Sequence, residues 1–132
     1  MTKTKVEHID YWLQQAEDDW EAVETLLSGR KNLQALFFAH LTIEKICKAA
    51  WIRENSNDIP PKTHNLIFLL SQTSINLKED QSEFLLNLNR FQIEGRYPDY
   101  ISKIRQICDD DFTKQMIIKI KEFKLWLLKR MQ

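Results

Sequence analysis

Apolar side chains recur every three or four positions near the start of the chain, which is the spacing of one face of an α-helix. The first such row consists of Ile9, Trp12, Leu13, Ala16, Trp20, Val23 and Leu27, with Leu26 beside it. This pattern predicts a helix with one broad apolar face. The helix should end at Ser28 and Gly29, where the glycine can adopt a left-handed cap.

A second segment, roughly residues 32 to 54, carries two apolar rows instead of one. One row holds Leu33, Phe37, Cys47 and Trp51, and the other holds Leu36, Ala39, Ile43, Ile46 and Ala50. A helix that is apolar on most sides is expected at the centre of the fold. His40 and Glu44 interrupt the first row. Their spacing of four residues puts them on one helical face, within reach of a hydrogen bond or ion pair.

The segment from 55 to 62 breaks this pattern with Asn-Asp and a Pro-Pro pair, which predicts a loop. We expect Thr63 to cap a third helix that runs to about Thr73. His64 would then lie in the first turn of that helix.

Three further helices are predicted in the second half of the chain. They cover roughly Lys78 to Phe91, a short stretch around Tyr100 to Ile107, and a last long helix with an apolar stripe from Phe112 to Leu127. Gly95 and Pro98 interrupt the chain before the short helix. The sequence therefore predicts an all-α fold, an antiparallel up-and-down bundle of about five helices forming a single domain over residues 1–132.

Composition agrees with this fold and narrows the classes of function. Only two glycines and three prolines occur among 132 residues, which favours long helices around one core. The chain has neither 18 consecutive apolar residues nor an apolar leader, so we expect a cytoplasmic protein without a membrane span. Cys47 and Cys108 share no close spacing with each other or with a histidine, so the sequence predicts reduced thiols and no metal site. The sequence contains no glycine-rich phosphate-binding loop, so we expect no bound cofactor.

Nineteen acidic and nineteen basic side chains cancel, so the chain lacks the general attraction for nucleic acid that a strongly basic domain has. The first 30 residues are locally acidic, and residues 103–130 are locally basic. We interpret both as solvated helix faces, with Asp109 to Asp111 suited to the start of the last helix. The four tryptophans are expected to anchor the core or an interface, and we expect homodimerisation through a leftover apolar face.

Four segments, read in order, carry a resemblance to a known family. They are YWLQQAEDDW at 11–20, FFAHLTIEKICKA at 37–49, PPKTHNL at 60–66 and LNRFQIEGRYPD at 88–99. Together they span nearly the whole chain, and the set resembles the HEPN family of small bacterial and archaeal helical domains. The last segment is similar to the Arg-Tyr-Pro-Asp segment of one large HEPN branch.

The resemblance implies an antiparallel helical bundle that often dimerises and is frequently encoded beside a small nucleotidyltransferase, the two forming a toxin–antitoxin pair. Many HEPN members are metal-independent ribonucleases, in which an arginine is followed after a short spacer by a histidine and often by a tyrosine. The histidine can move a proton of the RNA near neutral pH, and the arginine can hold the scissile phosphate through two hydrogen bonds.

Mapped onto this chain, Arg90 matches the family's arginine and Tyr97 matches its tyrosine, but the histidine position is Gly95. A glycine cannot transfer a proton. Starting the count from Arg96 leads to residues 99–103, which also contain no histidine. The resemblance therefore implies a HEPN domain without the standard ribonuclease histidine.

The leading hypothesis is a binding and regulatory module that recognises a nucleotidyltransferase partner, a nucleotide or RNA without cutting it. Its candidate phosphate-binding residues are Arg90, Arg96, Tyr97 and Asp99, since two arginines beside a tyrosine hydroxyl suit an anion. An equally weighted interpretation is structural, with the arginines paired to Glu94 or Asp99 and Tyr97 in a turn.

Two alternatives stay open. The first is a metal-independent ribonuclease with an unorthodox base drawn from His40, His64, Glu94 or Asp99. The second is a purely structural helical adaptor, in which His40 and Glu44 form a satisfied buried pair and His64 merely begins a helix. By family analogy, a partner transferase could also attach adenylate to Tyr97.

Overall fold

The computed structural model describes residues 3–93 and 98–132, and for residue 93 and residues 98–101 it describes the backbone alone. All regular structure in these ranges is helical. The helices are α1 (Lys5–Ser28), α2 (Asn32–Glu54), α3 (Leu66–Ser71), α4 (Glu79–Ile93), α5 (Pro98–Ile107) and α6 (Asp110–Arg130). The predicted all-α helical bundle is confirmed, with six helices in the described ranges where about five were expected.

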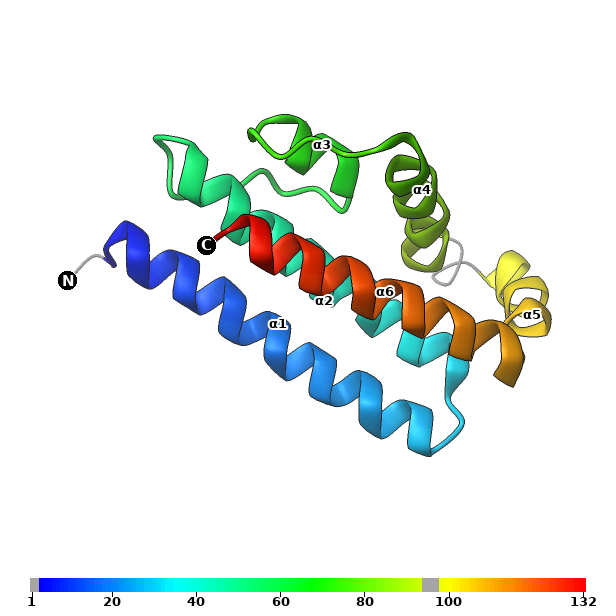
Figure 1. Cartoon of the computed structure of the whole chain (residues 1–132). Coiled ribbons are helices and arrows are strands. Elements are labelled where there is room, and N and C mark those ends of the chain that lie inside the picture. The colour runs from blue at the N-terminus through cyan, green and yellow to red at the C-terminus, as the bar shows by residue number, and fades with distance from the viewer. Residues whose placement is uncertain (1–2, 94–97) are drawn as a thin grey trace.

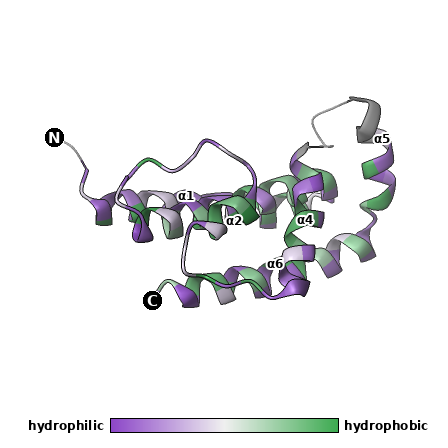
Figure 2. Ribbon diagram, turned by 90° about the horizontal axis from the view of Figure 1, so that it is seen from above, coloured by the Kyte–Doolittle hydropathy of each residue, from purple (hydrophilic) through white to green (hydrophobic). Residues whose placement is uncertain are grey.

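α2 lies at the centre of the bundle and has the bounds that its two apolar rows predict. α1 runs antiparallel to it in the most extensive contact between any two helices, and α6 lies along it (Figure 1). α3 and α4 pack on another side of α2. Both rows are buried except for the half-buried Phe37, and Ile43, Ile46 and Ile52 are almost completely inaccessible to water. Seen from above, hydrophobic and hydrophilic turns alternate along α6, as expected of an amphipathic helix at the edge of a core (Figure 2).

The turn between α1 and α2 differs in one detail from the expectation. α1 ends at Ser28 as predicted, but Gly29 has φ −87° and Arg30 is the residue in the left-handed region, with φ 57°. The N–H of Arg30 donates to the carbonyl of Leu27, and that of Lys31 donates to the carbonyl of Leu26. These two bonds form a Schellman cap in which an arginine occupies the position that usually holds glycine.

The start of α1 is fastened to the end of α2. Lys5 Nζ donates to the backbone oxygens of Ile52 at 2.8 Å and Asn55 at 2.7 Å, and contacts Asp58 Oδ1 at 2.7 Å. The carbonyls at the end of a helix lack partners within it, so the ammonium group satisfies acceptors that α2 leaves open. Asp58 belongs to the α2–α3 loop (residues 55–65), so the same lysine also holds this loop.

α3 begins later than predicted. The side chain of Asn65, not that of Thr63, caps the helix, because Asn65 Oδ1 accepts the N–H of Phe68 at 3.1 Å. The hydroxyl of Thr63 instead accepts the N–H of Asn65 and stabilises a turn before the helix. The expectation that His64 lies in the first turn is therefore wrong. His64 belongs to the α2–α3 loop, which leaves its side chain free to reach α2.

The other helices of the second half are α4, α5 and α6. Where the sequence predicted an end of one of these helices, the observed end lies within two residues of it. Asp109 caps α6 by accepting the N–H of Phe112 at 2.8 Å. Pro98 is the first residue of α5, a position that tolerates proline because the first N–H groups of a helix have no internal acceptor. Met116, Ile120, Phe123 and Leu127 of α6 are buried, in agreement with the predicted stripe.

Cys47 and Cys108 are buried free thiols. Burial raises the pKa of both, to about 11 for Cys108, because a thiolate is poorly solvated in the protein interior. Among the described residues, no group of histidine, cysteine and acidic side chains is arranged to hold a metal ion, and no helix is long and apolar enough to cross a bilayer.

Candidate functional site

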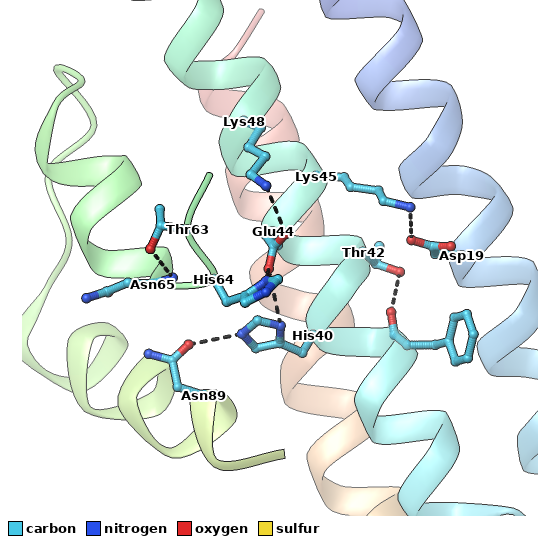
Figure 3. A network of polar contacts seen from close by, with 11 residues as sticks. Asp19, His40, Thr42, Glu44, Lys45, Lys48, Thr63, His64, Asn65 and Asn89 are labelled. Carbon is cyan, nitrogen blue, oxygen red and sulfur yellow. Dashed lines mark hydrogen bonds and ion pairs between the residues drawn. The ribbon is translucent and has the colours of Figure 1, made fainter. Parts of the chain in front are cut away.

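The buried carboxylate of Glu44 lies among basic and polar side chains on the side of α2 that faces α3 and α4 (Figure 3). Lys48 Nζ donates to Glu44 Oε2 at 3.1 Å, and His64 Nδ1 lies 2.7 Å from Oε1. His40 Nδ1 is 3.9 Å from the same Oε1, while its Nε2 is 3.0 Å from Asn89 Oδ1. These five residues, from α2, the α2–α3 loop and α4, form what we call the Glu44 cluster.

Local sequence explains most of this arrangement. His40, Glu44 and Lys48 follow one another at intervals of four residues, which places them on one face of α2. His64 reaches that face because α3 starts only at Leu66 and the loop before it is not helical. Asn89 arrives from α4, 49 residues after His40 in the chain.

His64 is oriented by Glu44 and remains accessible. A carboxylate oxygen only accepts hydrogen bonds, so Nδ1 of His64 carries the proton in their 2.7 Å contact. Nε2 of the neutral ring then keeps its lone pair. Because half of the His64 side chain is exposed, the ring combines a fixed orientation with access for a ligand.

His40 has the opposite environment. Its side chain is fully buried, and burial lowers its pKa by removing water from the charged form. The hydrogen bond to Asn89 and the charge of Glu44 act in the other direction without overcoming this effect. The amide oxygen of Asn89 accepts, so Nε2 carries the proton and the lone pair of Nδ1 faces Glu44. With this tautomer, the 3.9 Å between Nδ1 and Glu44 Oε1 is not a hydrogen bond.

The structure thus brings together three candidates that the sequence singled out separately: His40, Glu44 and His64. The spacing of His40 and Glu44 correctly indicated their proximity, although their shortest hydrogen bonds go to Asn89 and His64. Sequence reasoning missed Lys48 and Asn89. The same four-residue spacing could have pointed to Lys48, whereas no local signal identifies Asn89.

The other candidates lie around the end of α4. Arg90 follows Asn89, is exposed, and comes close enough to Cys108 for its charge to oppose the effect of burial on the thiol pKa. Arg96 and Tyr97 lie outside the described residues, as does the side chain of Asp99. Glu94 and Gly95 fall in the same gap.

The Glu44 cluster supports two chemical interpretations. As a structural network, it fixes the α2–α3 loop and α4 to α2 through satisfied polar contacts. As a reactive pair, Glu44 and His64 have the geometry of a general base held in position by a carboxylate. The exposed side of His64 distinguishes this pair from an entirely buried network.

Comparison with known proteins gives one family match. The model of the family described as HEPN domain matches residues 9–131, nearly the whole chain. No curated protein and no solved structure gives a significant match.

Proposed function

Because the chain belongs to the HEPN domain family, we propose that it is a cytoplasmic binding and regulatory module that holds RNA or a nucleotide without the family's histidine-dependent cleavage. The observation that carries this proposal is Gly95, which occupies the histidine position counted from Arg90. Glycine has no group that can accept or donate a proton in the transition state.

His40, the fully buried histidine of the Glu44 cluster, does not replace the missing histidine. His40 is fully buried and already bonded to Asn89, so it has no access to a phosphodiester. Its lowered pKa keeps it neutral near pH 7 and removes its value as an acid.

The proposed ligand contact is made by the segment that begins at Arg90. The side chain of Arg90 is exposed at the end of α4, and Arg96, Tyr97 and Asp99 follow within nine residues. Guanidinium groups bind phosphate oxygens through paired, charge-assisted hydrogen bonds, which supports an anionic ligand. By family analogy, we further propose that the domain acts as a homodimer and is the partner of a small nucleotidyltransferase in a toxin–antitoxin pair.

Binding and cleavage can be tested with one labelled single-stranded RNA. We expect fluorescence anisotropy to report binding, and we expect no cleavage in EDTA. The double change Arg90→Ala, Arg96→Ala should weaken binding roughly tenfold or more, since it removes charge-assisted hydrogen bonds. Arg53→Ala, which removes an exposed arginine at the far end of α2, is the matched control. Equal binding by both variants would contradict the proposed contact and favour a structural adaptor.

A second candidate function is metal-independent ribonuclease activity with His64 as the base. The 2.7 Å contact that orients His64 on Glu44, together with its exposed ring, favours this alternative. It predicts cleavage that survives EDTA and is lost in His64→Gln. The same cleavage should be lost in the double arginine variant and retained in Arg53→Ala. Thermal unfolding of each variant would separate loss of activity from loss of fold.

A further inference from the structure

A groove with an aromatic floor lies between α4 and α6. Its volume is about 610 Å³, and its apolar lining residues are Phe84, Met116, Phe123 and Trp126. The ring centroids of Phe84 and Phe123 are 6.0 Å apart, and those of Phe123 and Trp126 are 5.6 Å apart. Contiguous rings of this kind are typical of surfaces that receive apolar side chains. We call this feature the α4–α6 groove.

The rim of the groove is acidic. Asp80 and Glu83 of α4 and Glu122 of α6 line it, against a single cationic side chain in the lining, that of Lys119. All four side chains are exposed. An occupant that matches the groove therefore needs apolar side chains for the floor and positive charges for the rim.

The outer face of α6 carries this complementary pattern. Ile118 and Leu125 are 50% and 57% exposed, and their spacing of seven residues puts them on one face of the helix. Lys114, Lys121 and Lys129 are exposed on the same side, at intervals of three or four residues from these apolar positions. We call these five residues the α6 stripe. It lies opposite the buried row of α6 that contains Ile120 and Leu127.

We propose that the occupant of the α4–α6 groove is the α6 stripe of a second copy of this chain. α6 provides both the stripe and one wall of the groove, so a twofold arrangement can seat each stripe in the groove of the other copy. Ile118 and Leu125 then cover the aromatic floor while the lysines meet the acidic rim. This inference rests on the proposed homodimer and specifies the surface through which it forms.

The test is the dimer dissociation constant of the full chain, measured by sedimentation equilibrium. Leu125→Asp should weaken the wild-type dimer roughly 30-fold or more, as expected when a central interface side chain is removed. The matched control is Leu86→Asp. Leu86 is 58% exposed on α4 but is not part of the groove lining, so this change should leave the dimer intact. Both positions are exposed, which allows both variants to fold.

A charge exchange tests the rim. Lys121→Glu should weaken the dimer, and adding Glu83→Lys in the same chain should restore it, because the two signs are then exchanged in both copies. Further weakening in the double variant would overturn the proposed charge pairing. A wild-type dimer unaffected by Leu125→Asp would overturn the groove as the interface while leaving the homodimer standing. If the chain were a monomer at about 100 μM, well above typical dissociation constants of stable dimers, both the groove interface and the homodimer would be overturned. The RNA-binding test above does not depend on the oligomeric state.

Discussion

His64 lies 2.7 Å from Glu44 across 20 residues of chain, and this contact fixes the position of the loop before α3 on the middle of α2. The carboxylate is shared, because Lys48 donates to its other oxygen. A buried acid that accepts hydrogen bonds from two donors, one of them an ammonium group, is stabilised without water. Removing the acid should therefore affect the folded protein more than removing an exposed partner of an ion pair.

The first prediction concerns this carboxylate. Glu44→Ala should lower the free energy of unfolding by about 3 kcal/mol, because it leaves the buried ammonium group of Lys48 without its acceptor. Asp58→Ala is the control. Asp58 pairs with Lys5 at 2.7 Å, but the side chains of Lys5 and Asp58 are 40% and 34% exposed, so its loss should cost less than about 1 kcal/mol. Urea unfolding followed by tryptophan fluorescence measures both, and equal losses would contradict a special role for the Glu44 cluster.

The second prediction is a pH dependence that arises from His40. Its pKa is lower in the folded protein than the ordinary value of 6.5, so the unfolded chain binds more protons in the range between the two values. Above pH 6.5, His40 should therefore not lower the free energy of unfolding. As the pH drops below 6.5, the free energy of unfolding should fall. The loss continues until the pH passes the folded-state pKa.

The variant His40→Gln keeps a donor for Asn89 but cannot titrate. Comparison of urea midpoints at pH 7.5, 6.5 and 5.5 should show a smaller decline for the variant than for the wild type. Glu44 and His64, the titratable groups that face His40, are present in both proteins, so the difference isolates the buried imidazole. Parallel declines would show that His40 does not titrate differently on folding.

The third prediction separates two neighbouring residues in the α1–α2 turn. Arg30 is left-handed, a conformation that costs a residue with a Cβ roughly 1–2 kcal/mol. Arg30→Gly should therefore raise the free energy of unfolding by up to about 1 kcal/mol after the entropy of the unfolded glycine is subtracted.

Gly29→Ala tests the neighbouring residue in the same turn. Gly29 has a negative φ, and an added Cβ would come no closer than 3.7 Å to the carbonyl oxygen of Leu26, which is ordinary contact. This change should be neutral or slightly stabilising. If thermal unfolding showed Gly29→Ala to be destabilising and Arg30→Gly to be neutral, the left-handed position would be Gly29, as the sequence alone suggested.

These cases show what local sequence can predict for this fold. Helical periodicity gave both ends of α2 and identified the buried row of α6, because each depends on side chains within the same helix. Thr63 was wrongly expected to cap α3, since Thr63 and Asn65 are both good caps and only the fold decides between them. Sequence also could not distinguish which of Gly29 and Arg30 is left-handed.

The candidate site illustrates the same limit. His40 and Glu44 were linked by spacing on one helix, but their meeting with His64 and Asn89 depends on how α3 and α4 pack against α2. Such contacts join residues 20 and 49 positions apart and leave no periodic trace in the sequence. The α4–α6 groove is likewise created by two helices that are distant in the chain.

The three hydrogen bonds of Lys5 have a consequence for how the molecule opens. They connect the first turn of α1, the end of α2 and Asp58 in the α2–α3 loop, while Glu44 holds the other end of that loop through His64. The loop therefore cannot detach at either end without breaking a contact to a long helix. Amide hydrogen exchange in these segments is then expected to proceed through one shared opening event, so that the loop behaves as part of the same cooperative unit as the two long helices.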